Sequence, residues 1–267
     1  MKTLLLVHAH PDDEAITTGG VMLRAHQDGH RVVLVTATRG EEGAICNMDE
    51  ASVRPRLAEV RTEELRHSCE ILGVDRQEFL GYRDSGMEGA PSNQDPRSFR
   101  SAPLSEAAER LALLLREERP DVVVTYTPDG TYGHPDHVKA HHTTLAALDI
   151  LEGEGWRPPK VYLHAVPRSF VEQVVRAAAE AGLHLPDVIT QIRGTADEEI
   201  TTAVDVSDLV DRKLAAYAAH VSQIDPDGPF ATMAPQIFES VFAIERFVLY
   251  RGVRLDDRPE SSLFAGV

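Results

Sequence analysis

Two short clusters of histidine and acidic residues each follow an apolar run of the chain. The first, HAHPDDE at residues 8–14, follows the run at residues 3–7, and the second, HPDH at residues 134–137, follows the run at residues 121–126. Imidazole nitrogens and carboxylate oxygens are ligands that zinc prefers, and a catalytic zinc site keeps one position open for water. The residue types therefore predict a three-ligand metal site with a spare base, the constellation of a metal-assisted hydrolase.

The spacing within the clusters indicates which residues could bind the metal and which could transfer protons. His10 and Asp13 are three residues apart on a tight strand-to-helix turn, so both side chains could reach one metal ion. His137 would complete a set of two histidines and one carboxylate. Asp12 is then a free carboxylate, near enough to accept a proton from water. His134, if protonated, could stabilise an oxyanion or protonate a leaving amine.

Simpler explanations exist for each cluster taken alone. A lone histidine at a strand end is more often a hydrogen-bonded structural residue than a ligand, and acidic residues at a helix start suit the helix macrodipole. Two such clusters at one sheet edge are much harder to explain structurally, so we favour the metal site. Zinc is the expected ion, although Fe²⁺ or Mn²⁺ also fits a His/carboxylate set. Asp136 is expected to orient His134.

The clusters need a scaffold that ends two strands at one edge. Near-continuous Val/Leu strands separated by helical patterns favour an α/β fold, a parallel sheet with helices on both faces, and such sheets bind ligands at the carboxyl ends of their strands. The expected strands are residues 3–7, 31–37, 78–80, 121–126 and 160–166. The expected helices are residues 14–28, 56–72, 104–118 and 136–151, with Gly73 as the stop of the second.

The pattern weakens after Pro167. We expect one domain, with a catalytic core at residues 1–166 and a smaller C-terminal segment at residues 167–267 that walls the site. The expected elements of that segment are helices at 169–181 and 207–221 and strands within 199–206 and at 247–251. The longest loop, residues 81–103, is of a length that is usually functional or disordered.

Composition narrows the class of protein. The chain has 267 residues, with 43 acidic against 27 basic side chains and a formal net charge of −16. Such a surface repels phosphate backbones, so we expect no nucleic-acid partner. No apolar run approaches the ~18 residues of a membrane span, which leads us to expect neither a membrane segment nor a signal peptide. Cys46 and Cys69 suit reduced thiols, and we expect a cytoplasmic enzyme whose homo-oligomeric state stays open.

The motifs together resemble those of the LmbE-like, or PIG-L, zinc-dependent N-deacetylases. AHPDDE at residues 9–14 and HPDH at residues 134–137 match two motifs of the family, and TRGEEG at residues 38–43 matches its T-x-G-E-x-G loop. The resemblance covers about residues 1–166. It implies a Rossmann-like α/β fold and zinc. It also implies that the metal ligands are His10, Asp13 and His137. Asp12 would be the general base and His134 the electrostatic or acid partner.

A finer resemblance concerns RDSGM at residues 83–87, which is similar to a loop of the mycothiol-pathway branch. That branch contains the N-acetylglucosaminyl-inositol deacetylases and the mycothiol S-conjugate amidases. The resemblance implies that Asp84 and Met87 border the sugar pocket. An alternative for Asp84 is that it caps the backbone of its own loop.

The same branch implies three further contacts. Tyr132 would help to hold the carbonyl oxygen, Arg61 would contact substrate, and His220, in AHVSQ at residues 219–223, would reach the pocket. Tyr132 could instead be a turn residue, and Arg61 could be solvated or in an i,i+4 pair like Arg66.

The resemblance implies hydrolysis of the acetamide of a small molecule that contains N-acetylglucosamine, releasing acetate and a free amino sugar, in low-molecular-weight thiol biosynthesis. The alternatives are an amidase that cleaves thiol S-conjugates, a deacetylase of a larger glycan or antibiotic, and a sugar-binding protein without turnover. The presence of Asp12 and His134 argues against the last, because binding alone needs no base. Glu14 and Glu41 could hold backbone amides rather than act on substrate.

Overall fold

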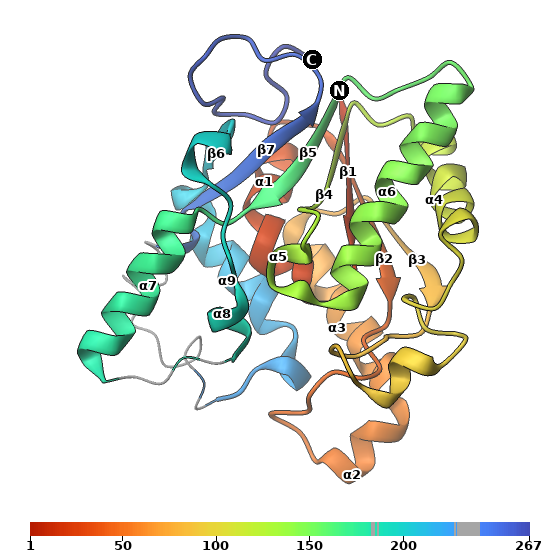
Figure 1. Ribbon diagram of the computed structural model, residues 1–267, viewed down its shortest axis with the longest axis vertical. Coiled ribbons are helices and arrows are strands. Elements are labelled where there is room, and N and C mark those ends of the chain that lie inside the picture. Colours follow the sequence, from red (N-terminus) through yellow and green to blue (C-terminus); the bar gives the residue numbers. More distant parts are fainter. Residues whose placement is uncertain (183–184, 186, 227, 229–240) are drawn as a thin grey trace.

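A single twisted sheet organises the molecule (Figure 1). The computed structural model describes residues 1–182, 185, 187–226, 228 and 241–267, and these contain seven strands in the order β3-β2-β1-β4-β5-β7-β6. β1 to β5 are parallel to one another, whereas β7 is antiparallel to both β5 and β6. The predicted, mostly parallel α/β sheet is confirmed. The strands are β1 (Thr3–His8), β2 (Arg31–Thr38), β3 (Arg76–Tyr82), β4 (Val122–Tyr126), β5 (Lys160–Ala165), β6 (Thr202–Asp205) and β7 (Ile244–Arg251).

The side chains of β1 show why both faces of the sheet are covered. Leu4 and Leu6 belong to one apolar core, Leu5 and Val7 belong to the other, and all four are fully buried. Because strand side chains alternate between faces, a strand made only of apolar residues needs helices on both sides. One face is covered by α1 (Asp13–Gln27), α3 (Leu57–Leu72) and α9 (Val210–Ala218), and the other by α4 (Leu104–Glu118) and α6 (Pro135–Gly153) (Figure 1).

The other helices of the described residues are short or lie at the periphery of the fold. They are α2 (Glu50–Val53), α5 (Gly130–Gly133), α7 (Arg168–Ala181) and α8 (Asp187–Gln191), with 3₁₀ turns η1 (Arg54–Arg56), η2 (Pro91–Gln94), η3 (Asp197–Glu199), η4 (Ser207–Leu209) and η5 (Val221–Gln223). Gly73 ends α3 with φ 75°, as predicted. No helix among the described residues combines the length and apolar composition that crossing a bilayer requires.

Two regions differ from the sequence prediction. The helix expected at residues 207–221 is split into η4, α9 and η5, because the chain leaves the helical conformation at His220 (φ −84°, ψ 57°). The loop at residues 81–103 is not structureless. It contains η2, and Arg83 exchanges backbone hydrogen bonds with Arg97 and Phe99 at 3.0 and 2.9 Å. The C-terminal segment also extends the sheet, since β7 pairs with β5.

A buried ion pair fastens the residues around position 260 to β5. Lys160 Nζ lies 2.7 Å from both carboxylate oxygens of Glu260, and each side chain is only 3% exposed. Tyr162 Oη donates a further hydrogen bond to Glu260 at 2.9 Å.

Glu260→Ala is expected to lower the free energy of unfolding by about 3–5 kcal/mol, because the substitution leaves the Lys160 ammonium buried without a partner. Urea denaturation measures this change. Glu154→Ala is the matched control, because the Glu154–Arg116 pair is more exposed and such a surface pair contributes about 1 kcal/mol or less. Equal, small losses in the two variants would contradict the prediction.

Candidate active site

The loop after β1 places three acidic residues in one tight turn. Asp12 precedes α1 with φ 110° and ψ −32°, a backbone conformation that residues with a Cβ rarely adopt. Asp13 begins the helix, and its Oδ2 accepts a hydrogen bond from the backbone N–H of His10 at 2.8 Å. The Asp13 carboxylate therefore turns back toward His10 rather than out into solvent.

The loop after β4 is fixed by a close approach of backbone to ring. Gly130 has φ 64°, and a Cβ there would lie 2.7 Å from the Cβ of His137, so only glycine fits. The carbonyl oxygen of Gly130 accepts a hydrogen bond from His137 Nδ1 at 3.2 Å. His134 caps α6, since its Nδ1 accepts a hydrogen bond from the backbone N–H of Asp136 at 3.1 Å.

The two clusters meet at the carboxyl ends of β1 and β4, as the sequence predicts. Asp13 Oδ2 lies 3.5 Å from His10 Nδ1, and Asp13 Oδ1 lies 3.4 Å from His137 Nε2. The rings of His10 and His134 are 4.5 Å apart between centroids. His10, Asp13, His134 and His137 are all buried.

The chemistry of this cluster fits a divalent metal ion. His137 Nε2 is buried and lies 3.4 Å from Asp13 Oδ1, yet it makes no hydrogen bond with any described residue, which leaves its lone pair available to a metal ion. Ligand atoms of His10, His134 and His137 lie within 4.8 Å of one another, as do those of His10, Asp84 and Asp136. Burial lowers the pKa of His10, but the surrounding carboxylates of Asp84, Asp13 and Asp136 raise it more, which marks a strongly negative site.

Asp136 does not orient His134 through its side chain, which corrects the expectation from the sequence. Its Oδ2 accepts a hydrogen bond from the backbone N–H of Ser85 at 2.9 Å and lies 3.3 Å from His10 Nε2, and its Oδ1 accepts from the Ser85 hydroxyl. Only the backbone N–H of Asp136 reaches His134. The reason is that His134 is the helix cap, so its Nδ1 faces the first turn of the backbone.

His134 is not protonated, unlike the imidazolium that the sequence suggested as a possible acid. Burial, together with the nearby His10 and His137, lowers the pKa of His134 to about 2, so its imidazole is neutral. Because Nδ1 accepts a hydrogen bond, the neutral ring carries its proton on Nε2. His134 can therefore donate a hydrogen bond from Nε2 without first being protonated.

Arg61 holds the Asp12 loop in place. Its side chain is 3% exposed, its guanidinium donates to Asp12 Oδ2 and to the carbonyl of Gly40 at 2.9 Å each, and it also donates to the carbonyl of Pro11. The solvated alternative is therefore wrong for Arg61, while Arg66 does form exposed pairs with Glu63 and Glu70. A substrate contact of Arg61 stays a prediction.

The environment of Asp12 tunes its carboxyl toward neutral pH. Burial raises the pKa of Asp12 to about 6, more than the Arg61 guanidinium lowers it. A carboxyl that titrates near the working pH is well matched to proton transfer.

The loop that carries Asp84 is hydrogen-bonded to the loop after β2. Asp84 Oδ1 accepts a hydrogen bond from the backbone N–H of Gly86 at 2.8 Å, so the backbone-capping alternative is confirmed. Glu41 accepts from the backbone N–H of Asp84 at 3.0 Å, and so it does hold a backbone amide. Met87 is 43% exposed at the surface of this loop.

Tyr132 lies beside the histidine cluster, and its ring centroid is 4.9 Å from that of His137 and 6.1 Å from that of His134. Burial raises the pKa of Tyr132, so its phenol keeps its proton and can donate a hydrogen bond. Its contact with a carbonyl oxygen stays a prediction.

His220 is buried against the loop that carries Asp12 and does not lie at an open surface. It is fully buried, and its Nε2 lies 2.7 Å from Glu14 Oε1. Glu14 in turn accepts from the backbone N–H of Asp12 at 2.9 Å, so Glu14 also holds a backbone amide. Burial raises the pKa of Glu14, but His220, Ser68 and the Asp12 N–H together lower it below its ordinary value.

Tyr126, at the end of β4, is a site residue that sequence reasoning missed. Its hydroxyl donates to Asp13 Oδ2 at 2.8 Å and accepts from the backbone N–H of Ala9 at 3.0 Å, and its ring stacks on His137 at 4.3 Å. The residue resembles any other aromatic residue in an apolar strand, and only its position at the end of that strand, ahead of the second cluster, could have drawn attention to it.

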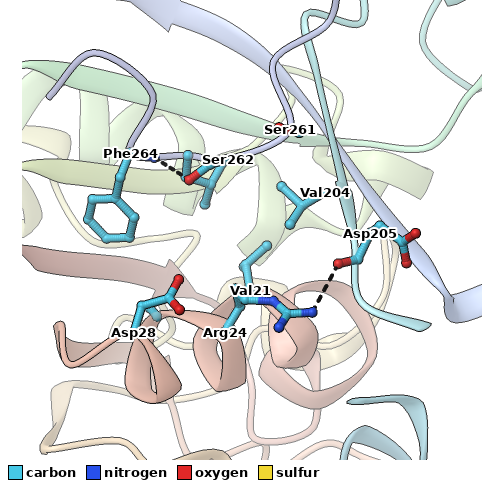
Figure 2. Close-up of a pocket in the computed structure, with 10 residues that line it drawn as sticks. Val21, Arg24, Asp28, Val204, Asp205, Ser261, Ser262 and Phe264 are labelled. Atoms are coloured by element: carbon cyan, nitrogen blue, oxygen red, sulfur yellow. Dashed lines mark hydrogen bonds between the residues drawn. The ribbon is translucent and has the colours of Figure 1, made fainter. Parts of the chain in front are cut away.

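A cavity of about 270 Å³ lies elsewhere, between α1, β6 and the C-terminal residues (Figure 2). Its Arg24 belongs to α1 eleven residues after Asp13, or roughly 16 Å along the helix. The Arg24 guanidinium already pairs with Asp208 and bonds the carbonyl of Asp205. We therefore assign the candidate site to the histidine cluster and not to this cavity.

Comparison with known proteins gives consistent matches. The family model for GlcNAc-PI de-N-acetylase, PIG-L, matches residues 5–148. The 1D-myo-inositol 2-acetamido-2-deoxy-alpha-D-glucopyranoside deacetylase of Acidothermus cellulolyticus is 44% identical over 284 residues, which covers 100% of this chain and 96% of that protein. The protein of the same name from Thermobifida fusca is 41% identical, covering 99% of each.

Among solved structures, the N,N'-diacetylchitobiose deacetylase from Pyrococcus horikoshii, complexed with its inhibitor, matches with a TM-score of 0.64 and 23% identity. The match covers 97% of this chain and 87% of that one. At this level of identity the likeness shows the fold alone.

Proposed function

The chain belongs to the GlcNAc-PI de-N-acetylase (PIG-L) family, and from this premise we propose that it hydrolyses the acetamide of N-acetylglucosamine linked to inositol. It is an amide hydrolase, and the products are acetate and the free amino sugar. The observation that carries the proposal is the identity of about 40% over the full length to deacetylases whose printed substrate is this glycoside. The convergence of His10 and Asp13 with His134 and His137 supports it.

We assign the metal ligands from the free lone pairs of the cluster. His137 donates Nδ1–H to Gly130, which leaves its buried Nε2 free to bind a metal. His10 has Nε2 beside Asp136, which suits an Nε2–H donor and leaves Nδ1 near Asp13. His134 carries its proton on Nε2 and so has no lone pair to offer. His10, Asp13 and His137 would therefore hold the ion, which we propose is zinc.

Tyr126→Phe is expected to weaken zinc binding by about 10- to 100-fold, because the Asp13 carboxylate loses the hydroxyl that orients it. Competition with a chromophoric chelator measures the zinc Kd. Tyr250→Phe, at an exposed position on β7, is the control and should leave the Kd unchanged. An unchanged Kd in Tyr126→Phe would show that the hydroxyl does not act on the ligand.

The protein side chains divide the remaining work. A divalent metal held by this set would polarise the acetyl carbonyl and make water a nucleophile near neutral pH. Asp12, held by Arg61, accepts a proton from the attacking water. The Nε2–H of His134 and the phenol of Tyr132 donate hydrogen bonds to the developing oxyanion. Asp12 then passes this proton to the departing amine.

The sugar is proposed to lie between the metal cluster and the loop at residues 83–87, with Asp84 and Met87 at its border. Asp84 Oδ1 lies 3.5 Å from His10 Nε2, so this loop contacts the cluster directly. The two unpaired cysteines suit a reducing compartment, and we propose that the enzyme works in the cytoplasm.

The test is a comparison of substrates with the zinc-loaded protein. Acetate release and free amine are measured with N-acetylglucosaminyl-inositol, with free N-acetylglucosamine and with a thiol S-conjugate that has a bulkier acyl group. We expect the inositol-linked sugar to have the highest kcat/KM. A higher kcat/KM for the S-conjugate would favour the amidase alternative, and binding without acetate release would favour a sugar-binding protein.

A further inference from the structure

His220 joins the C-terminal part of the chain to the loop of the catalytic base. Its imidazole donates a hydrogen bond to Glu14 Oε1 at 2.7 Å, across 206 positions of the sequence. The hydroxyl of Ser68 donates to the same oxygen at 2.6 Å. His220, Glu14 and Ser68 are all fully buried. His220 also lies outside residues 5–148, the range that the family model matches.

The second oxygen of Glu14 holds the backbone of Asp12. Glu14 Oε2 accepts a hydrogen bond from the Asp12 N–H at 2.9 Å, and Asp12 has φ 110°. A non-glycine residue in such a conformation is strained and persists only where its surroundings determine it fully. Arg61 restrains the carbonyl of Pro11 and the side chain of Asp12, and Glu14 restrains the N–H between them.

We propose that His220 is a positioning residue for the base, acting through Glu14. Two donors on Oε1, the imidazole and the Ser68 hydroxyl, fix the rotation of the Glu14 carboxylate so that Oε2 faces the Asp12 N–H. This contact sets the direction in which the Asp12 carboxylate points toward the attacking water. The inference rests on the proposed function, and it replaces the expected substrate contact of His220, because no part of that ring is exposed.

The turn that carries His220 has its own anchors. The backbone N–H and hydroxyl of Ser222 donate to Glu64 at 2.6 and 2.7 Å, and Gln223 Nε2 donates to the carbonyl of Ala44 at 2.9 Å. Loss of the His220 side chain therefore removes the contact with Glu14 while the turn stays attached. This separation makes the proposal testable by single substitutions.

The experiment compares His220→Phe, which keeps a ring but no donor, with His220→Gln, whose amide can still donate to Glu14. His220→Phe is expected to lower kcat by about 10- to 100-fold with KM changed less than about twofold, because misplacing a catalytic group costs rate rather than binding. Zinc content should stay at one per chain. His220→Gln should recover most of the lost rate, and His67→Phe, at an exposed site on α3, should behave as wild type.

A second readout does not depend on the substrate. In isotope-labelled protein, the amide proton of Asp12 should move upfield in His220→Phe and stay in place in His67→Phe. If the wild-type protein releases no acetate, the proposed function fails, while the amide shift still tests the positioning. If His220→Phe does not fold, Ser68→Ala serves in its place. It removes the other donor to Glu14 Oε1 and should also lower kcat. The proposal is overturned if His220→Phe raises KM and leaves kcat unchanged. It is also overturned if both kcat and the Asp12 amide shift of this variant equal those of the wild type.

Discussion

Asp12→Asn is expected to lower the turnover of the acetylated amino sugar by about 10²–10⁴-fold, the range that a positioned general base contributes. Asparagine keeps the size of the side chain and an oxygen for Arg61, but its amide cannot take a proton from water. The variant should still bind one zinc per chain, because Asp12 is not among the proposed ligands. Acetate release and metal content are measured on the same preparation.

Asp28→Asn serves as the control, since this exposed aspartate lies just after the other end of α1. It should retain the wild-type rate. If Asp12→Asn also turned over at the wild-type rate, the base would have to be another group of the site. Loss of zinc from Asp12→Asn would instead move Asp12 into the ligand set.

His137→Gln is expected to weaken zinc binding by more than about 100-fold, because even the loss of an outer-shell partner costs about 10–100-fold. Turnover should fall to background at zinc concentrations that saturate the wild-type enzyme. We choose His137 because its buried Nε2 forms no hydrogen bond with any described residue and is therefore free to bind a metal ion. Metal analysis after dialysis measures the effect.

The neighbouring histidine His142, which is exposed on α6, provides the matched control. His142→Gln should keep its zinc and its rate. A His137→Gln protein that retained stoichiometric zinc would refute the assigned ligand set, and loss of zinc from His134→Gln instead would exchange the roles of these two histidines.

The sequence predicts much of the scaffold because its signals are local. The apolar runs mark β1, β2, β4 and β5, and polar residues right after β1 and β4 predict that His10 and His137 meet. The parallel arrangement of these strands follows from the helices between them. The antiparallel insertion of β7 next to β5 has no local signal, because strand pairing partners are chosen by tertiary packing.

The contacts that orient the site were less predictable. Asp136 sits two residues from His134 in sequence, yet its carboxylate turns to Ser85 and His10, which no spacing rule reveals. Tyr126 and His220 act on Asp13 and Glu14 through folds of the chain that bring distant residues together. Motif resemblance predicts which groups react, while the groups that hold them depend on three-dimensional packing.

The strand order has a consequence for how the chain acquires its structure during synthesis. β7 is made after β5 and β6 but lies between them, so neither of those strands can complete its pairing until β7 arrives. Until then the outer edge of β5 and both edges of β6 present unpaired N–H and C=O groups, which are templates for aggregation. Pairing across such sequence separations is also slow. Folding yield, more than the stability of the finished sheet, should therefore be sensitive to substitutions in β7.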